Sequence, residues 1–437
     1  MNLWQELGFR ENPYSTDPVP PDDDGVQLLV GREKELQRLT RNLTSSNNHT
    51  TIEGLNGVGK TSLVGVATYK LFREHQHSAT KTALFIPVRN PFQISASETP
   101  ETFSDKFMIT LAREIAARRE LLDQHQSGLR NLTDLDRWLN NPLLHGGGGG
   151  VSILGLGANL TLTSSANTGQ GFTRGGVEAH LREILKAVFP TKASGGFVCI
   201  LDNLELLDTS ARARATLEAL RDGVLSFPGV RWVLCGAKGI VRSVVSTPRL
   251  QGKLSEPLEL APLTAENVQR AIQKRLELFK LRTDAYTPID VDGFQRVYDI
   301  SHHNLRISLK YCEDFVLWCI DSGNRPVSAE DKLGLLDVWF ADQAETALQD
   351  TSDVGQRAWE VFDGIGDRKE GISPGDFEDF NFNSPQALQP HLRSLEQAAL
   401  IESSTDEIDK RRKTITLTPR GWVVRYRRRN FQPEKST

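Results

Sequence analysis

Short apolar runs alternate with amphipathic segments over the first 260 residues of the chain. The apolar runs are typical of buried strands and lie at Thr50–Glu53, Ala83–Val88, Phe197–Leu201 and Arg231–Cys235. The amphipathic segments carry apolar residues at helical spacing and lie at Ser62–Phe72, Phe103–Leu121, Val177–Val188 and Ala211–Leu225. This alternation predicts an α/β domain over residues 31–260, in which helices flank a parallel sheet.

The segments on either side of this domain have other patterns. Residues 1–30 contain Asn12-Pro13 and a proline- and aspartate-rich stretch from Pro18 to Asp24, which predicts an irregular lead-in without helices. After Pro262 the apolar positions recur only at helical spacing, and Thr264 and Asn304 stand where helices begin. We therefore expect a small helical domain over residues 261–325.

An insert interrupts the α/β pattern. Five glycines at Gly146–Gly150 precede a segment in which apolar and polar residues alternate from Asn159 to Ser164. Glycine gives the backbone unusual freedom, and alternation is typical of strands. We interpret residues 146–165 as a β-hairpin on a glycine hinge, with a disordered loop as the alternative.

The pattern of residues 326–437 predicts a winged helix-turn-helix domain. Ser373-Pro374 and Ser384-Pro385 are helix starts, and Leu400-Ile401 with Thr414–Thr418 form the strands of a hairpin whose tip is Lys410–Lys413. Thr418-Pro419 opens a closing helix that ends in the basic run Arg425–Arg429. Pro390 interrupts the third helix, so we expect a kink there or a later start.

The charge is uneven along this C-terminal part. The whole chain has 52 basic and 56 acidic residues, a net charge of −4, which excludes a uniformly basic nucleic-acid coat. Between Glu330 and Phe380, however, there are 14 acidic and 4 basic residues, a balance of −10. From Glu402 to Arg429 there are 4 acidic and 9 basic residues, a balance of +5. A local basic surface is therefore compatible with the near-neutral total.

Cysteine usage and hydropathy indicate the compartment. Four cysteines are too few to stabilise a chain of 437 residues through disulfide bonds. Their spacing fits neither a disulfide framework nor a metal site. The N-terminus has no signal-peptide pattern, and no apolar run approaches the length of a membrane span. We expect a cytoplasmic protein with buried thiols and no membrane contact.

One motif identifies a phosphate-binding loop. The chain fits G-x-x-x-x-G-K-[ST] between a predicted strand and a predicted helix, which is the context that this loop requires. Its glycines let backbone N–H groups approach phosphates, the lysine reaches the β- and γ-phosphates, and the threonine hydroxyl binds Mg²⁺. The expected nucleotide-binding residues are Gly54, Leu55, Asn56, Gly57, Val58, Gly59, Lys60, Thr61 and Ser62.

A second metal-binding residue is expected at the end of a buried strand. Asp202 follows the apolar run Phe197–Leu201 and is predicted to bind Mg²⁺ together with Thr61. The residue after it, where many relatives of such proteins have a catalytic glutamate, is Asn203. Two hypotheses follow: Glu205 acts as the base that activates water, or hydrolysis is slow and the protein works as a nucleotide-controlled switch.

These motifs together resemble the AAA+ ATPases. The opening Val30-Gly31-Arg32-Glu33, the phosphate-binding loop, the strand before Asp202 and the helical segment resemble the origin-recognition and initiator group and the transposition ATPases. The signalling NTPases of the STAND class share the opening motif. The resemblance covers residues 28 to 320, and implies ATP and Mg²⁺ as ligands and a helical lid over the nucleotide.

The resemblance also implies roles for single residues. Val30, Gly31 and Arg32 would lie near the adenine, and Arg306 in Asn304-Leu305-Arg306 would contact the γ-phosphate as a sensor in the lid. Arg249, or alternatively Arg242, would be the arginine finger offered to a neighbouring subunit. The position after the fourth strand departs from the family pattern, because Cys235-Gly236-Ala237-Lys238 replaces the usual polar sensor.

Two functions are compatible with these patterns. The first is an AAA+ ATPase that forms homo-oligomers and binds duplex DNA through the wing Lys410–Lys413, the basic closing helix and residues 386–393. The second is a STAND-like regulatory or defence switch whose winged helix contacts protein, with a partner chain supplying the effector. A hydrolase acting on small substrates is not supported, because no catalytic triad or metal cluster is present in the pattern.

Overall fold

The computed structural model describes residues 2–78, 82–125, 174–207, 210–237, 239–349, 351, 353–368, 371–405 and 413–430. The chain divides into two compact units. The sheet unit comprises residues 34–53 and 60–259, and the helical unit comprises residues 1–33, 54–59 and 260–437. The hairpin predicted over residues 146–165 lies outside the described residues.

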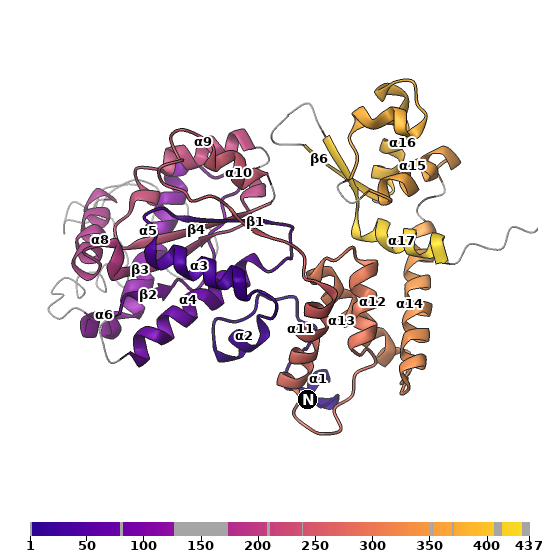
Figure 1. The fold of residues 1–437 in the computed structure, drawn as a ribbon, viewed down its shortest axis with the longest axis horizontal. Coiled ribbons are helices and arrows are strands. Elements are labelled where there is room, and N and C mark those ends of the chain that lie inside the picture. Colours follow the sequence, from indigo (N-terminus) through magenta and orange to yellow (C-terminus); the bar gives the residue numbers. More distant parts are fainter. Residues whose placement is uncertain are drawn as a thin grey trace, which may run out of the picture. The chain divides into compact units, whose positions relative to one another are not determined.

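The sheet unit is built on a five-stranded sheet in the order β2-β3-β4-β1-β5 (Figure 1). The strands pair in parallel from β2 to β3, from β3 to β4 and from β1 to β4. The strand bounds are β1 Thr50–Gly54, β2 Leu84–Pro87, β3 Gly195–Leu201, β4 Val230–Gly236 and β5 Leu258–Leu260. The predicted parallel α/β fold is confirmed. Each of the four predicted strands ends within one residue of the C-terminal end that the structure gives it.

Helices cover both faces of this sheet. Alternate residues of β3, namely Phe197, Cys199 and Leu201, belong to a core shared with α5 (Pro100–Ala117), α8 (Arg174–Val188) and α9 (Ser210–Leu220). Helix α4 (Lys60–His77) contacts β2, β3 and β4 and buries its own apolar residues. Every residue of β1, β3 and β4 is buried. Strand β3 reads as an unbroken apolar run in the sequence, whereas β1 contains Thr50, Thr51 and Glu53 and β4 contains Arg231.

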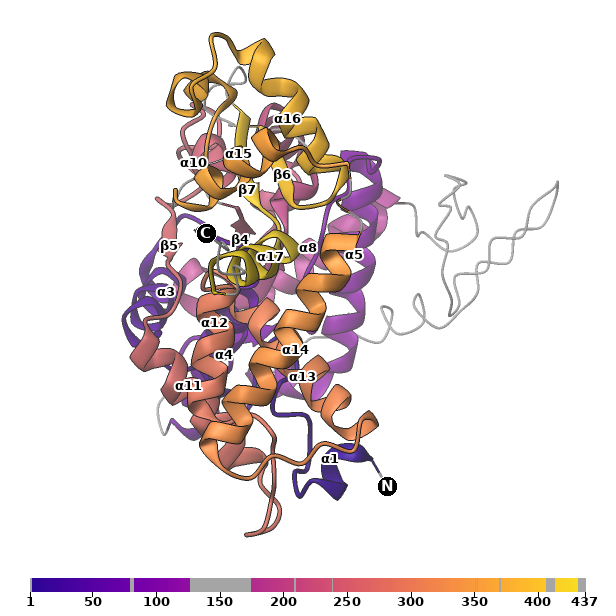
Figure 2. The same ribbon diagram turned by 90° about the vertical axis from the view of Figure 1, so that its right-hand side faces the viewer.

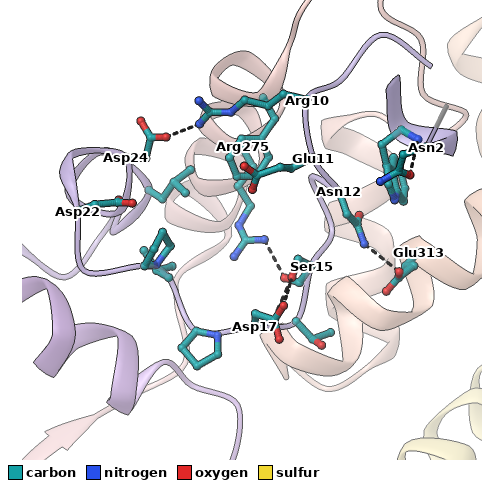
Figure 3. A pocket seen from close by; sticks show the side chains of 17 residues that line it. Asn2, Arg10, Glu11, Asn12, Ser15, Asp17, Asp22, Asp24, Arg275 and Glu313 are labelled. Carbon is teal, nitrogen blue, oxygen red and sulfur yellow. Dashed lines mark hydrogen bonds and ion pairs between the residues drawn. The ribbon is translucent and has the colours of Figure 1, made fainter. Parts of the chain in front are cut away.

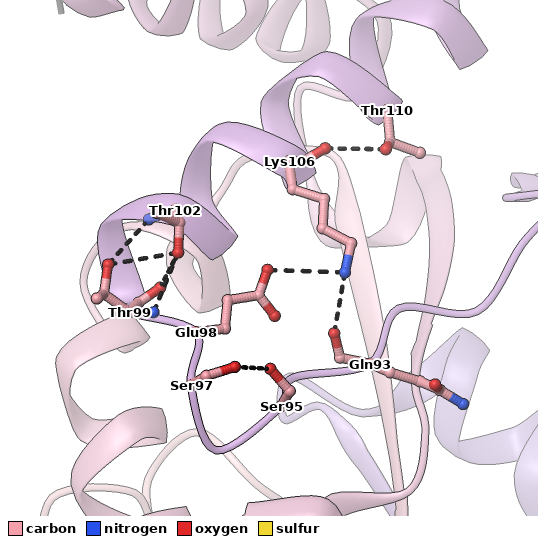
Figure 4. Close-up of polar contacts among 8 residues, drawn as sticks. All are labelled: Gln93, Ser95, Ser97, Glu98, Thr99, Thr102, Lys106 and Thr110. Carbon is pink, nitrogen blue, oxygen red and sulfur yellow. Dashed lines mark hydrogen bonds and ion pairs between the residues drawn. The ribbon is translucent and has the colours of Figure 1, made fainter. Parts of the chain in front are cut away.

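The other elements of the sheet unit are short connections. They are α6 Arg119–His125, α10 Ile240–Val245, and the 3-10 helices η1 Lys192–Ser194, η2 Leu204–Leu207 and η3 Val224–Ser226. A longer helix, α3 (Glu33–Ser45), precedes β1. The connection from β2 to α5 is held by Lys106, whose ammonium donates to the Gln93 carbonyl at 3.1 Å and faces Glu98 (Figure 4). Thr99 and Thr102 form a capping box that starts α5 after this connection (Figure 4).

The helical unit begins with the N-terminal segment, and here the prediction of an irregular lead-in is wrong. Residues 1–30 contain α1 (Leu3–Glu6) and α2 (Asp23–Leu28). Trp4, Phe9 and Tyr14 are buried in the same core as the helices that follow residue 260. The Tyr14 hydroxyl donates to the Ile289 carbonyl at 2.9 Å, which ties the segment to that core.

Helices make up the rest of this core. They are α11 Ala265–Phe279, α12 Val291–Ile300, α13 Leu305–Asp321 and α14 Ala329–Gln349. Thr264 caps α11 and Asn304 caps α13 through their side chains, as their positions in the sequence predict. Figures 1 and 2 both show α14 running beside α13.

A second core in the same unit is formed by the C-terminal elements. In chain order these are α15 Gln356–Gly366, the 3-10 helix η4 Pro374–Phe380, α16 Pro385–Gln397, the antiparallel strands β6 Ile401–Thr405 and β7 Lys413–Leu417, and α17 Pro419–Asn430. Helix α16 continues through Pro390, which is exposed. Two consecutive residues of α17 lie in different cores. Val423 packs with α11–α14, and Val424 packs with α15 and α16.

All four cysteines are buried and unpaired, as the sequence predicts. Burial raises the pKa of each thiol, so all four are protonated at neutral pH. Within the described residues, no helix is long and apolar enough to cross a membrane.

Candidate nucleotide-binding site

The phosphate-binding loop follows β1 and leads directly into α4. Gly57 and Gly59 have φ angles of +80° and +96°, a region that side chains strongly disfavour. Leu55 is exposed, whereas Val58, Lys60 and Ser62 are buried. Strand β1 lies between β4 and β5, and ligands of open parallel sheets bind beyond such a strand's carboxyl end. The loop therefore has both the backbone and the position that phosphate binding requires.

In the helical unit, the start of α13 lies against this loop. A Cβ atom on Gly57 would lie 2.7 Å from the Cβ of Arg306 and 2.9 Å from Oδ1 of Asn304. The Asn304 amide also donates to the Asn56 carbonyl at 3.3 Å. Arg306 is exposed, and its guanidinium has no hydrogen bond or ion pair to any residue that the structure describes. It is therefore free to bind an anion beside the loop.

The three residues expected near the adenine have different surroundings. Arg32 is buried and donates to the Val58 carbonyl at 3.2 Å and to the Ala261 carbonyl at 2.8 Å, so its guanidinium braces the loop. Gly31 has φ +72°, and a Cβ there would clash with Asn267. Val30 lines a small cavity of about 150 Å³ on α11, large enough for part of a base. Of the three, Val30 is the one that lines this cavity, and no residue of the phosphate-binding loop lines it.

In the sheet unit, Thr61 and Asp202 meet directly. The Thr61 hydroxyl donates to Oδ2 of Asp202 at 2.6 Å, and Oδ1 of Asp202 accepts the Asn203 N–H at 3.0 Å. Asn203 has φ +56°, a left-handed conformation that asparagine tolerates better than most residues. A hydroxyl and a carboxylate that converge in this way are hard oxygen ligands, which suits Mg²⁺.

Glu205 lies near the same point. Its Oε2 accepts the Ala237 N–H at 3.1 Å, whereas its Oε1 is buried and has no partner among the described residues. The charges of Asp202, Lys60 and Glu205 all act on the buried thiol of Cys235, whose pKa is raised mainly by burial. These three predicted residues are thus grouped around the C-terminal end of β4, while Lys238 lies outside the described residues.

The two candidate arginine fingers have different partners. Arg242 donates to Oε1 of the buried Glu53 at 2.6 Å, which occupies it within its own chain. Arg249 is 72% exposed and makes one long contact of 3.5 Å with Glu218. Arg249 is therefore the more available of the two.

Two contacts of the site were not predicted. Glu53 lies directly before the loop, is fully buried, and leaves Oε2 without a partner among the described residues. The signal for it in the sequence was a charged residue at the end of the predicted strand, directly before the loop. Asn304 was recognised as a helix cap, but its bond to the loop joins residues 248 positions apart and has no local signature.

Four arginines of the basic closing helix, a candidate DNA contact, form ion pairs with three carboxylates of the same chain. Arg427 pairs with Glu345 of α14 at 2.6 Å, and Arg428 pairs with Asp363 of α15 at 2.8 Å. Arg425 and Arg429 both pair with Asp367, which caps α15. The acidic stretch of the sequence therefore supplies the carboxylates that pair with the arginines of α17. These ion pairs reduce the positive charge that α17 offers to DNA. The wing residues 410–412 lie outside the described residues.

Comparison with family models identifies a family for this chain. Residues 22–288 match the model of the family described as Novel STAND NTPase 1. A comparison with curated protein sequences gives no match.

Several solved structures are similar over most of their length. The ORC1 protein of Aeropyrum pernix in complex with DNA is 17% identical, with 97% of each chain covered and a TM-score of 0.44. A Walker-type ATPase of Pyrococcus abyssi is 12% identical, with 95% of this chain and 99% of that chain covered and a TM-score of 0.45. Cdc6p from Pyrobaculum aerophilum is 14% identical, with 94% and 96% covered and a TM-score of 0.43.

Proposed function

Because the chain belongs to the Novel STAND NTPase 1 family, we propose that it is a slow ATPase that works as a nucleotide-controlled switch. The observation that carries this proposal is the approach of Arg306 to Gly57, since it gives the phosphate-binding loop a free cation from the start of α13. The γ-phosphate is the group that distinguishes ATP from ADP. An arginine that binds it reports which nucleotide is bound.

The residues have distinct roles in this proposal. Backbone N–H groups of the loop and the Lys60 ammonium bind the phosphates, and Val30 contacts the adenine. Thr61 and Asp202 hold Mg²⁺, which, when bound, neutralises phosphate charge. Glu205 orients the attacking water through its unpartnered Oε1 and accepts the proton. Asn203 takes the position of the usual glutamate, and this replacement is the proposed reason for slow turnover.

The switch output is proposed to pass from α13 to α17. His302 and His303, directly before Asn304, have φ angles of +51° and +62°, so this turn is strained. The His302 ring stacks on Trp422 of α17, with ring centroids 4.2 Å apart and planes 8° apart. A shift of Arg306 toward a phosphate would therefore act on this stack and on the C-terminal core.

The proposal is tested in the full chain by nucleotide binding, hydrolysis and intrinsic tryptophan fluorescence, to which Trp422 contributes. Lys60→Ala should abolish ATP binding, and Glu205→Gln should keep binding but reduce phosphate release by about a hundredfold. Glu256→Gln changes an exposed carboxylate of the same unit and should hydrolyse ATP normally. ATP and ADP should give different fluorescence, and His302→Ala should remove the difference. Normal ATP binding by Lys60→Ala would refute the site.

Oligomerisation belongs to the same proposal. Arg249 is exposed and would complete the nucleotide site of a neighbouring copy, where a guanidinium stabilises charge on the transferred phosphoryl group. ATP should then raise the mass of the particle in solution, and Arg249→Ala should reduce hydrolysis in the assembly while leaving ATP affinity unchanged.

Duplex DNA binding is the second candidate function. We propose that residues 353–430 form a winged helix, in which α16 buries Leu388, Leu392 and Leu395 and exposes Gln386 and Arg393. Because the arginines of α17 are paired, the DNA contacts would come from Arg393 and the wing. Arg393→Ala combined with alanines at 410–413 should abolish binding at low salt, whereas Arg427→Ala should not. No DNA binding by the intact chain with ATP would leave the protein-contacting switch as its function.

A further inference from the structure

The helical unit contains a cavity of about 810 Å³ between its N-terminal segment and helices α11 and α13 (Figure 3). Its walls come from residues 2–28, from Arg275 and Phe279 of α11, and from Glu313 of α13. None of its lining residues belongs to the phosphate-binding loop. A nucleotide bound at Gly54–Gly59 would therefore leave this cavity free.

Arg275 is a cation in this cavity without a counter-ion. One nitrogen of its guanidinium, Nη1, donates to the Pro13 carbonyl at 3.2 Å. It also donates to the Ser15 carbonyl at 2.9 Å (Figure 3). No carboxylate of the described residues lies within ion-pair distance of it. Burial lowers the pKa of Arg275 to about 10, with no neighbouring charge opposing this effect. A guanidinium has five N–H donors, so this one keeps donors for an anion.

The other arginine of the cavity is already neutralised. Arg10 forms an ion pair with Asp24, and its guanidinium lies 5.0 Å from the centre of the Phe279 ring. It therefore closes one wall and leaves Arg275 as the anion-binding group.

Carboxylates form the opposite side. Glu313 accepts from the Asn12 amide at 2.8 Å, and burial, followed by the charge of Asp314, raises its pKa. Asp17 is exposed and is held by Ser15 at 3.1 Å. The lining includes five acidic side chains and two arginines, an excess of negative charge. A simple anion would be repelled by this excess, and a simple cation would leave Arg275 uncompensated.

We propose that this cavity binds a small zwitterion, with its carboxylate or phosphate group on Arg275 and its ammonium group toward Glu313 and Asp17. The buried faces of Trp4 and Phe279 supply an apolar surface for the hydrocarbon chain that joins the two charges. This site is additional to the proposed nucleotide site, and its ligand binds without ATP.

The test measures binding to the full chain by calorimetry and Trp fluorescence, without nucleotide. The probes are glycine, γ-aminobutyrate, ε-aminocaproate and O-phosphoethanolamine, compared with succinate and putrescine, which carry only one kind of charge. At least one zwitterion should bind saturably, and at least about tenfold more tightly than either single-charge probe. Comparison of γ-aminobutyrate with O-phosphoethanolamine distinguishes carboxylate from phosphate. Absence of saturable binding up to about 10 mM for all four zwitterions would overturn the proposal.

Variants assign the contacts. Arg275→Gln should lower the affinity for the zwitterion at least about tenfold. Lys274 is an exposed neighbour on the same helix, and Lys274→Gln should leave this affinity unchanged. Glu313→Gln and Asp17→Asn should lower the affinity for the zwitterion but not the affinity for succinate. If Arg275→Gln does not fold, Arg275→Lys replaces it and should bind several-fold more weakly, because a single ammonium lacks the forked donors. Unchanged affinity in whichever Arg275 variant folds would refute the assignment.

Discussion

Arg306 lies directly over Gly57, so that a Cβ atom at position 57 would be 2.7 Å from the Cβ of Arg306. Gly57 also has φ +80°, and a side chain there would carry both a backbone penalty and a steric clash. The loop and the start of α13 can approach each other this closely only with glycine at this position.

Gly57→Ala should therefore separate α13 from the loop. We expect ATP affinity to fall at least about tenfold, because the loop distorts and Arg306 moves away. Gly323→Ala is the matched control, since Gly323 has φ +70° but nothing within 4 Å of the point where a Cβ would lie. It should cost about 1 kcal/mol of stability and leave ATP affinity unchanged. Equal ATP affinity in Gly57→Ala and the native chain would contradict the importance of this contact.

The contact between Thr61 and Asp202 predicts a dependence on Mg²⁺. Thr61→Ala removes the hydroxyl that lies 2.6 Å from the carboxylate, so ATP affinity in the presence of Mg²⁺ should fall by about 10- to 100-fold. Affinity measured with a chelator should change little, because the loop N–H groups remain. Thr61→Ser keeps the hydroxyl and should behave as the native chain. An equal loss with and without Mg²⁺ would mean that Thr61 acts on the loop alone.

The sheet was predictable because its strands are buried on both faces. A strand such as β3 appears in the sequence as an unbroken apolar run, and Asp202 stands out at its end. The helix starts at Thr264 and Asn304 were predictable for a similar reason, since capping depends on residues only three positions away.

The prediction for the N-terminal segment was wrong because the structure of this segment depends on contacts with distant residues. Its prolines correctly exclude long helices, but Trp4 and Tyr14 are buried by helices that follow residue 260. The hydrogen bond from Arg32 to the carbonyl of Ala261, 229 residues away, is likewise a long-range contact that the sequence does not show. The pairing of α17 with the acidic stretch is also a long-range relationship, which charge balances along the chain do not show.

The pairing of Arg425 depends on a glycine in α15. Arg425 is buried, donates to Asp367 at 2.6 Å and to the Asp363 carbonyl at 3.0 Å, and occupies the space where a Cβ on Gly366 would lie. Gly366→Ala should displace the guanidinium from these partners and destabilise the C-terminal core by about 1–3 kcal/mol. The measurement is urea unfolding followed by tryptophan fluorescence.

Gly334→Ala provides the comparison for this prediction. Gly334 lies inside α14 and has nothing within 4 Å of a Cβ, so alanine there should stabilise the helix by up to about 1 kcal/mol. Opposite signs for the two substitutions are expected. A neutral Gly366→Ala would mean that the Arg425 pairs contribute nothing to stability.

His49 predicts how the stability of the sheet unit depends on pH. Its Nδ1 accepts the Trp232 N–H at 3.1 Å, so Nε2 carries the proton and donates to the Leu225 carbonyl at 2.6 Å. Burial is the main reason that the pKa of His49 is lowered from 6.5 to about 4, and the positive charges of Lys192, Arg231 and Lys253 lower it further. The folded chain thus keeps His49 neutral at a pH where the unfolded chain protonates it.

This difference destabilises the folded state as the pH falls. The contribution of His49 is fully present above pH 6.5 and is lost progressively toward pH 4, because only the unfolded state gains a proton in that window. Between pH 7 and pH 5 the loss should be about 2 kcal/mol. His49→Gln removes the titration, so its free energy of unfolding should fall less over this range than that of the native chain. Hydrogen exchange of a peptide covering β4 measures this difference, and parallel pH profiles for the two proteins would refute the role of His49.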